Sequence, residues 1–179
     1  AAAAITGGDV ELIGARADHL QAVIEKFAEA GVQITETPRG LRVQANGRIQ
    51  GIDIMTAPYS GYPTDMQAQM MALLSVAEGA SMITETIFEN RYMHAPELMR
   101  MGARIVLHGA SAMIRGVPEL TGAEVMATDL RASVSLVIAA LAAKCETTIH
   151  RVYHLDRGYE RLEEKLAAGS AQIQRITER

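Results

Sequence analysis

The sequence predicts a compact α/β domain with internal threefold pseudo-symmetry, because two kinds of repeat run through its 179 residues. Thr64–Met66 and Thr128–Leu130 each open a segment with apolar residues at helical spacing, and the two copies lie 64 residues apart. One helix-to-strand pattern also occurs three times, ending at Ile34, Ile105 and Ile173. Because this period is too long for a solenoid, we expect three strand-helix-strand-helix-strand-strand units, the first incomplete at its start. The units cover about residues 1–51, 52–116 and 117–179.

Apolar alternation, glycine stops and proline turns predict the individual elements. Residues 9–13 alternate as a strand does, and Pro38–Gly40 marks a turn between two further strands. Gly31 and Gly102 are expected to stop helices, and Pro96 predicts that the helix around it is short, kinked or started later. The expected strands are 9–13, 32–35, 41–44, 52–56, 82–88, 104–107, 112–115, 123–127, 147–152 and 172–176, and the expected helices begin at Asp18 and Asp65 or cover 90–101, 129–143 and 158–168.

Polar residues predict where the two repeated helices begin. Thr64 with Gln67 forms a capping box, which puts Asp65 in the first turn, where the helix dipole favours a carboxylate. Thr128 would open the second helix in the same way, with Arg131 at the position where a capping box has Glu or Gln. The similar starts support the duplication.

Three arginines are expected in the first turn of a helix, where a cation opposes the helix dipole by about 0.3–1 kcal/mol. Besides Arg131, Arg91 follows the expected cap Asn90, and Arg157 follows the expected cap Asp156. Each arginine alone is explained by pairing with a neighbouring carboxylate, since exposed ion pairs are common and weak. Three of them at starts related by the repeat favour a phosphate or carboxylate site, built from guanidinium groups and free backbone N–H groups.

Asp65 and Asp129 are the other candidate site residues. Near such cations an aspartate can act as a general base or hold an arginine in place, and the alternative for each is a simple first-turn carboxylate. If the arginines bind an anion, Arg131→Gln should remove stabilisation by phosphate. The same change should raise stability without phosphate by up to about 1 kcal/mol, because it restores a favourable first turn.

Composition argues against several classes of protein. The net charge is −4 at pH 7 with both signs mixed, so a general nucleic-acid-binding surface is not expected. The apolar runs are far shorter than a membrane span. The single cysteine, Cys145, fits a reducing cytoplasm and is expected as a small buried hydrophobe. The five histidines show no metal-ligand spacing, so no metal site is expected.

Four long motifs stand in order along the chain. They are PYSGYPTDMQAQ at 58–69, ETIFENRYMH at 85–94, MATDLRAS at 126–133 and YHLDRGYER at 153–161. Together they closely resemble the UDP-N-acetylglucosamine 1-carboxyvinyltransferase family of enolpyruvyl transferases, and the resemblance runs over essentially the whole chain. The related shikimate-pathway enolpyruvyl transferases share the architecture but not these strings.

The resemblance implies a fold and a reaction. The fold is a two-domain inside-out α/β barrel, in which each domain has three βαβαββ units with helices inside and sheets outside. The reaction moves the enolpyruvyl group of phosphoenolpyruvate to the 3′-hydroxyl of UDP-N-acetylglucosamine and releases phosphate, without a metal or an organic cofactor. It is the first committed step of peptidoglycan synthesis in the bacterial cytoplasm, and so serves cell-wall biogenesis, cell shape and cell division.

The resemblance also implies roles for single residues. Asp65 is similar to the family's candidate base near the sugar hydroxyl. The other expected substrate-binding residues are Ile87 and Phe88 with Arg91 at the UDP-sugar, and Arg131 and Arg157 with Asp129 at the phosphoenolpyruvate.

The chain begins with four alanines and no methionine, so we expect a piece of a longer protein, and the resemblance implies that it is the C-terminal part of such an enzyme. Its partner would be the second domain of the same enzyme, and we expect the isolated piece to be inactive and to self-associate through its uncovered surface. One alternative is a non-catalytic ligand-binding or structural domain of the same fold. Such a domain would release no phosphate after the missing domain is added, whereas the enzyme would. Another is an RNA-processing relative, against which the acidic balance counts.

Overall fold

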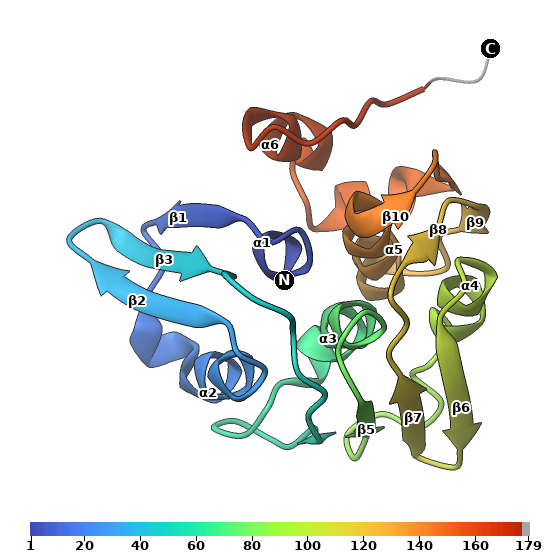
Figure 1. Ribbon diagram of the computed structural model, residues 1–179, viewed down its shortest axis with the longest axis horizontal. Helices are drawn as coiled ribbons and strands as arrows, with labels where there is room; N and C mark the ends of the chain where they lie inside the picture. The colour runs from blue at the N-terminus through green and yellow to red at the C-terminus, as the bar shows by residue number, and fades with distance from the viewer. Residues whose placement is uncertain (177–179) are drawn as a thin grey trace.

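Two helices, α3 and α5, lie at the centre of the computed structural model, which describes residues 1–176 (Figure 1). All eight residues of α3 (Gln67–Leu74) are buried, and α5 (Leu130–Ala142) is buried from Ala132 to Ala139. The two helices pack against each other. A helix buried on every face belongs to a core, and Figure 1 shows the two larger sheets on opposite sides of α3. The predicted arrangement of helices inside and sheets outside is therefore confirmed.

The four-stranded sheet shows the full predicted pattern. β4 (Ile54–Met55) and β5 (Ala80–Thr84) are parallel neighbours joined through α3. α4 (Ala95–Arg100) then leads to the antiparallel hairpin of β6 (Arg104–His108) and β7 (Ser111–Arg115). The strands lie in the order β4-β5-β7-β6. This segment therefore has the predicted β-α-β-α-β-β order along the chain.

The three-stranded sheet has the same pattern without its first strand. α1 (Ala2–Ile5) packs on α5 and leads into β1 (Asp9–Ile13). α2 (Gln21–Glu29) then precedes the hairpin of β2 (Gln33–Thr37) and β3 (Gly40–Gln44). The strand order β1-β3-β2 matches β5-β7-β6. Among residues 1–176, no strand lies on β1 as β4 lies on β5, so this repeat is incomplete at its start, as predicted.

Two short pairs of parallel strands flank α5. β8 (Leu120–Thr121) pairs with β10 (Ala143–Lys144), and β9 (Glu124–Met126) pairs with β11 (Thr148–His150). Since β4 and β5 are likewise parallel and joined through α3, α5 is the structural counterpart of α3. The predicted duplication of the inner helices is confirmed, whereas the exact limits of the three units stay a prediction.

The predicted helices begin one to five residues later than their expected first residues. α4 begins at Ala95 and not at residue 90, which is the later start that Pro96 predicted, because proline fits only the first turn of a helix, where its missing N–H costs no hydrogen bond. Asn90 is therefore not a cap, and it has φ of 59° in the preceding loop. The helix predicted at 158–168 is α6 (Leu162–Ala168), which follows the 3₁₀ helix η3 (Val152–Arg157).

The strand predicted at 172–176 does not form. A strand needs a neighbour to satisfy its backbone groups, and none of the strands within residues 1–176 lies beside this segment. Arg175 instead holds it by ion pairs to Asp156 at 2.6 Å and to Glu163 at 3.0 Å.

Cys145 is exposed, and the prediction that it is a buried hydrophobe is wrong. Burial was predicted because the sequence shows no base that could activate the thiol, but Cys145 lies in the connection from β10 to β11 with φ of 69°, a left-handed turn conformation. In the described part of the chain, no helix is long and apolar enough to cross a membrane.

Candidate functional site

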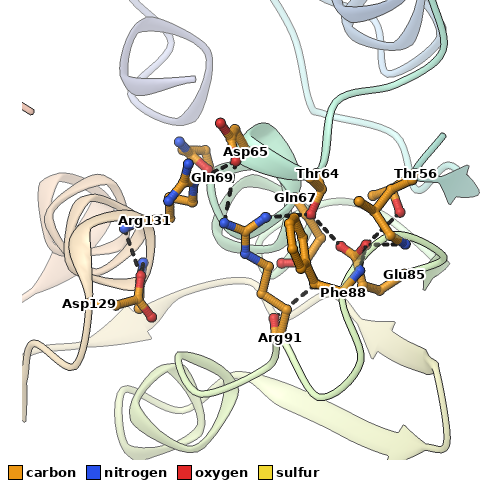
Figure 2. Close-up of polar contacts among 12 residues, drawn as sticks. Thr56, Thr64, Asp65, Gln67, Gln69, Glu85, Phe88, Arg91, Asp129 and Arg131 are labelled. Atoms are coloured by element: carbon orange, nitrogen blue, oxygen red, sulfur yellow. Dashed lines mark hydrogen bonds and ion pairs between the residues drawn. The ribbon is translucent and has the colours of Figure 1, made fainter. Parts of the chain in front are cut away.

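The candidate site lies at the N-terminal ends of the two inner helices and in the loop that follows β5 (Figure 2). Asp65 belongs to the 3₁₀ helix η2 (Thr64–Met66), immediately before α3. Arg131 is in the first turn of α5, and Arg91 is in the loop between β5 and α4. Because α3 packs on α5, residues far apart in the sequence meet at one place.

Asp65 bridges the two arginines. Its Oδ1 lies 2.5 Å from Nε of Arg131 and 3.3 Å from Nη2 of Arg91. The hydrogen bond from Arg131 is the main reason why the pKa of Asp65 lies below its usual range, and the charge of Arg91 adds to it. Asp65 is therefore ionised at neutral pH, although its side chain is 57% exposed. One carboxylate between two guanidinium groups leaves a local excess of one positive charge.

Asp129, not Thr128, caps α5. Its Oδ1 accepts from the backbone N–H groups of Arg131 at 2.8 Å and Ala132 at 2.9 Å. The predicted helix opening at Thr128 is therefore wrong by one residue, and helix α5 begins at Leu130. An aspartate is a strong N-cap because its carboxylate satisfies N–H groups that lack helical partners. Asp129 thus places Arg131 in the second helical position, with its guanidinium group toward Asp65.

Thr64 does not cap a helix either, and the predicted capping box with Gln67 is wrong. The Thr64 hydroxyl donates to Oε2 of Glu85 at 2.8 Å and accepts from Nη1 of Arg91 at 2.6 Å. Those partners are 21 and 27 residues away, beyond the reach of a local capping pattern. Arg91, predicted in a helical first turn, is instead a loop residue whose guanidinium carbon lies 4.7 Å from the ring centre of Phe88.

The backbone of Ile87 and Phe88 is bound by a buried carboxylate. Oε1 of Glu85 accepts from the N–H of Ile87 at 2.9 Å, from the N–H of Phe88 at 3.1 Å and from the hydroxyl of Thr56 at 2.8 Å. Burial would raise the pKa of Glu85, but these bonds and the Thr64 hydroxyl together lower it. Because Glu85 already accepts from both N–H groups, a ligand at this loop would contact side chains and carbonyl groups instead of these N–H groups.

Arg157 does not join the cluster. It is the last residue of η3, not a helix start, and its expected cap Asp156 pairs with Arg175. No ion pair or hydrogen bond within residues 1–176 connects Arg157 to Asp65, Arg91 or Arg131. Its neighbour Gly158 nevertheless packs against α5, since a Cβ there would lie 3.0 Å from a side-chain carbon of Leu130. Arg157 is thus an exposed residue beside the start of α5.

Sequence reasoning missed four residues at the site. Glu85 and Tyr159 stand inside the long motifs but had no role assigned. The Tyr159 hydroxyl lies 3.5 Å from Nε2 of Gln69, and burial raises the pKa of that hydroxyl. His94 is only 3% exposed, and burial lowers its pKa to about 4, so it is neutral. Gln69 and His94 end the first and second of these motifs and likewise had no role assigned.

The cluster is open to solvent. Two cavities of about 950 and 530 Å³ are lined by other residues, the first by α2 with the β2–β3 hairpin and the second by α1 with the loops that follow β3, α3 and β7. Within residues 1–176, no three His, Cys, Asp or Glu side chains are placed to hold a metal ion.

An α/β fold with a duplicated inner helix buried between outer sheets has the architecture of one domain of the enolpyruvyl transferase class. The comparisons agree with this class. The family model of EPSP synthase (3-phosphoshikimate 1-carboxyvinyltransferase) matches residues 1–166, and the chain belongs to this family.

Curated relatives are similar over nearly the whole chain. The UDP-N-acetylglucosamine 1-carboxyvinyltransferase of Paramagnetospirillum magneticum is 68% identical over 98% of this chain, and the protein of that name from Gluconobacter oxydans is 66% identical over 99%. The chain spans only 41% and 42% of their lengths. These relatives confirm the predicted resemblance.

A solved structure confirms the predicted fold class. The enolpyruvyl transferase NikO from Streptomyces tendae superposes with a TM-score of 0.78 and 28% identity, over 87% of this chain and 36% of NikO.

Phosphate is expected to stabilise the chain through Arg131. At phosphate concentrations ten times the dissociation constant, mass action adds about 1.4 kcal/mol to the free energy of unfolding, and Arg131→Gln should remove this gain. Without phosphate, the sequence predicted a rise of about 1 kcal/mol for this variant. The structure changes that expectation to almost no change, because the lost ion pair with Asp65 offsets the gain at the helix dipole.

Thermal unfolding with and without phosphate measures both effects. Arg42→Gln is the matched control, because Arg42 pairs with Asp9 on the outer sheet at 2.6 Å. Equal phosphate responses of the two variants would contradict an anion site at Arg131.

Proposed function

We propose that this chain forms part of the active site of an enzyme that transfers the enolpyruvyl group of phosphoenolpyruvate to the 3′-hydroxyl of UDP-N-acetylglucosamine. The observation that carries the proposal is the Asp65 carboxylate between Arg131 and Arg91 where the inner helices begin. The printed names of relatives at 68% and 66% identity support the choice of substrates.

The reaction requires both kinds of group found here. The sugar oxygen forms a bond to C2 of phosphoenolpyruvate while the hydroxyl loses a proton and C3 gains one. The bond from C2 to the phosphate oxygen then breaks, C3 loses a proton, and inorganic phosphate leaves. Guanidinium groups bind phosphate and carboxylate through paired hydrogen bonds, and a carboxylate beside the hydroxyl can accept its proton.

Asp65 has the properties of a base that is activated by substrate. While Arg131 and Arg91 bind it, the pKa of Asp65 is low and the carboxylate is a weak base. An arriving phosphate or carboxylate competes for the same guanidinium groups. As those groups turn to the substrate, the carboxylate loses its stabilising partners and its basicity rises. Proton abstraction is thereby tied to the presence of phosphoenolpyruvate.

The remaining site residues take supporting roles in this proposal. Asp129 holds the start of α5 and with it Arg131. Arg157 is exposed beside the start of α5, and in this proposal its side chain turns toward the phosphoenolpyruvate once that anion is bound. Phe88 and the backbone of Ile87 form the edge that faces the UDP-sugar, next to Arg91.

The biological setting follows from the proposed reaction. It is the first committed step of peptidoglycan synthesis, which takes place in the bacterial cytoplasm and supports cell-wall growth, shape and division. The relatives are more than twice as long as this chain, and we infer that activity needs a second domain that closes over the open cluster.

Phosphate release by the full-length protein tests the proposal. Phosphate should appear only when both phosphoenolpyruvate and UDP-N-acetylglucosamine are present, and mass spectrometry should find the enolpyruvyl ether of the sugar nucleotide. A full-length protein that binds the sugar nucleotide but releases no phosphate would contradict the proposal in favour of a non-catalytic binding domain.

A further inference from the structure

Glu85 is a buried carboxylate that touches neither Arg91 nor Asp65, yet its hydrogen bonds lead to Arg91 by two routes (Figure 2). It is 3% exposed and lies directly after β5. We propose that Glu85 is a positioning residue that holds Arg91 in the geometry required by the proposed transfer reaction. The inference rests on the proposed function in so far as Arg91 contacts substrate.

The first route passes through the hydroxyl of Thr64. A hydroxyl has one hydrogen to donate, and that of Thr64 goes to Oε2 of Glu85 at 2.8 Å. Arg91 can only donate, so its Nη1 at 2.6 Å must meet a lone pair of the same hydroxyl. A carboxylate that accepts the hydrogen of Thr64 therefore turns the lone pairs of Thr64 toward Arg91.

The second route passes through the backbone of the loop. Oε1 of Glu85 accepts from the N–H groups of Ile87 and Phe88, which fixes the turn after β5. The Phe88 side chain is 54% exposed and lies under the guanidinium group of Arg91. An aromatic face attracts a guanidinium cation, so the fixed turn holds Arg91 from a second side.

Arg91 has little freedom left once both routes are in place. Nη1 is bound to Thr64, Nη2 faces Asp65 at 3.3 Å, and the flat side of the group covers Phe88. A purely structural role for Glu85 would need only acceptors for the loop N–H groups. The bond to Thr64 goes beyond that need, because it reaches a hydroxyl that itself accepts from Arg91.

Glu85→Gln in the full-length protein separates the two roles. The glutamine oxygen still accepts from the loop N–H groups, while its NH₂ faces Thr64 and removes the acceptor for the Thr64 hydrogen. We expect kcat to fall roughly 10- to 100-fold, as misplaced groups cause, with KM values and the melting temperature almost unchanged. Thr64→Val should lower kcat by a similar factor, whereas Thr64→Ser, which keeps the hydroxyl, should retain most of the wild-type kcat.

A double-mutant cycle and a spectroscopic measurement decide the outcome. When Thr64→Val is already present, adding Glu85→Gln should lower kcat by less than about twofold, because two substitutions along one route do not have additive effects. The ¹⁵N resonances of the Arg91 guanidinium group should broaden in Glu85→Gln and stay sharp in Glu36→Gln, a control that removes an exposed carboxylate on β2.

The outcomes of the two proposals are distinguishable. Full activity of Glu85→Gln with unchanged Arg91 resonances overturns the positioning role, and so does full additivity of the two substitutions. If the wild-type protein is inactive, the proposed function fails, and the Arg91 resonances alone still decide whether Glu85 positions that arginine.

Discussion

Asp65→Asn is expected to lower kcat of the full-length protein by about 10²- to 10⁴-fold, the usual contribution of a general base. The amide keeps the size of the carboxylate, but it cannot accept the proton of the sugar hydroxyl. Binding of phosphoenolpyruvate should not weaken in the same proportion, because the amide no longer competes with the substrate for Arg131 and Arg91. Steady-state rates of phosphate release at varied concentrations of phosphoenolpyruvate measure kcat and the KM for this substrate.

The pH profile provides an independent check on Asp65. Arg131 lowers the pKa of Asp65 in the free protein, so the acid limb of kcat/KM should lie below the usual range of an aspartate, since that parameter reports the free enzyme. Asp65→Asn should abolish this limb. The control Asp9→Asn removes a carboxylate that is also paired with an arginine, Arg42, on the outer sheet, and should leave rate and profile unchanged. An Asp65→Asn rate within threefold of wild type excludes the role of base.

The fold could be predicted because its determinants are repeated along the chain. Apolar residues at helical spacing and glycines at helix ends are local signals. When the same signals recur at similar distances along the chain, each occurrence supports the interpretation of the others. The pattern around Ile34 and Ile105 located the two antiparallel hairpins well. The third copy, around Ile173, has the same local signal but no strand, because pairing depends on a neighbouring strand and not on the local pattern.

The site was predicted only in part, because long-range partners decide the roles of its residues. Asp65 and Arg131 were singled out by their places at helix starts, and the structure does bring them within 2.5 Å. Thr64 has a perfect local capping pattern, yet Glu85 and Arg91 use its hydroxyl instead. A capping threonine would accept from a backbone N–H, but the charged guanidinium of Arg91 donates to that oxygen instead, and no local pattern contains that competition.

Leu73→Ala is expected to destabilise the chain by about 2–5 kcal/mol, the range found for buried leucines. Leu73 lies on α3 and is completely buried, as is Leu136 on α5. Removing its side chain leaves a cavity where the two inner helices are packed among the sheets. Because the same packing brings the starts of α3 and α5 together, the variant should also lose part of its stabilisation by phosphate.

Urea unfolding in the presence and absence of phosphate separates these effects. Leu107→Ala is the matched control, since Leu107 lies on β6 with 43% of its surface exposed, and changes at such positions usually stay within about 0.5 kcal/mol. Its phosphate response should equal that of the wild type, because β6 contains none of Asp65, Arg91 and Arg131. If Leu73→Ala and Leu107→Ala lose equal stability, α3 is not the buried centre of the fold. If Leu73→Ala loses stability but keeps the full phosphate response, the pairing of Asp65 with Arg131 does not depend on how tightly α3 packs against α5.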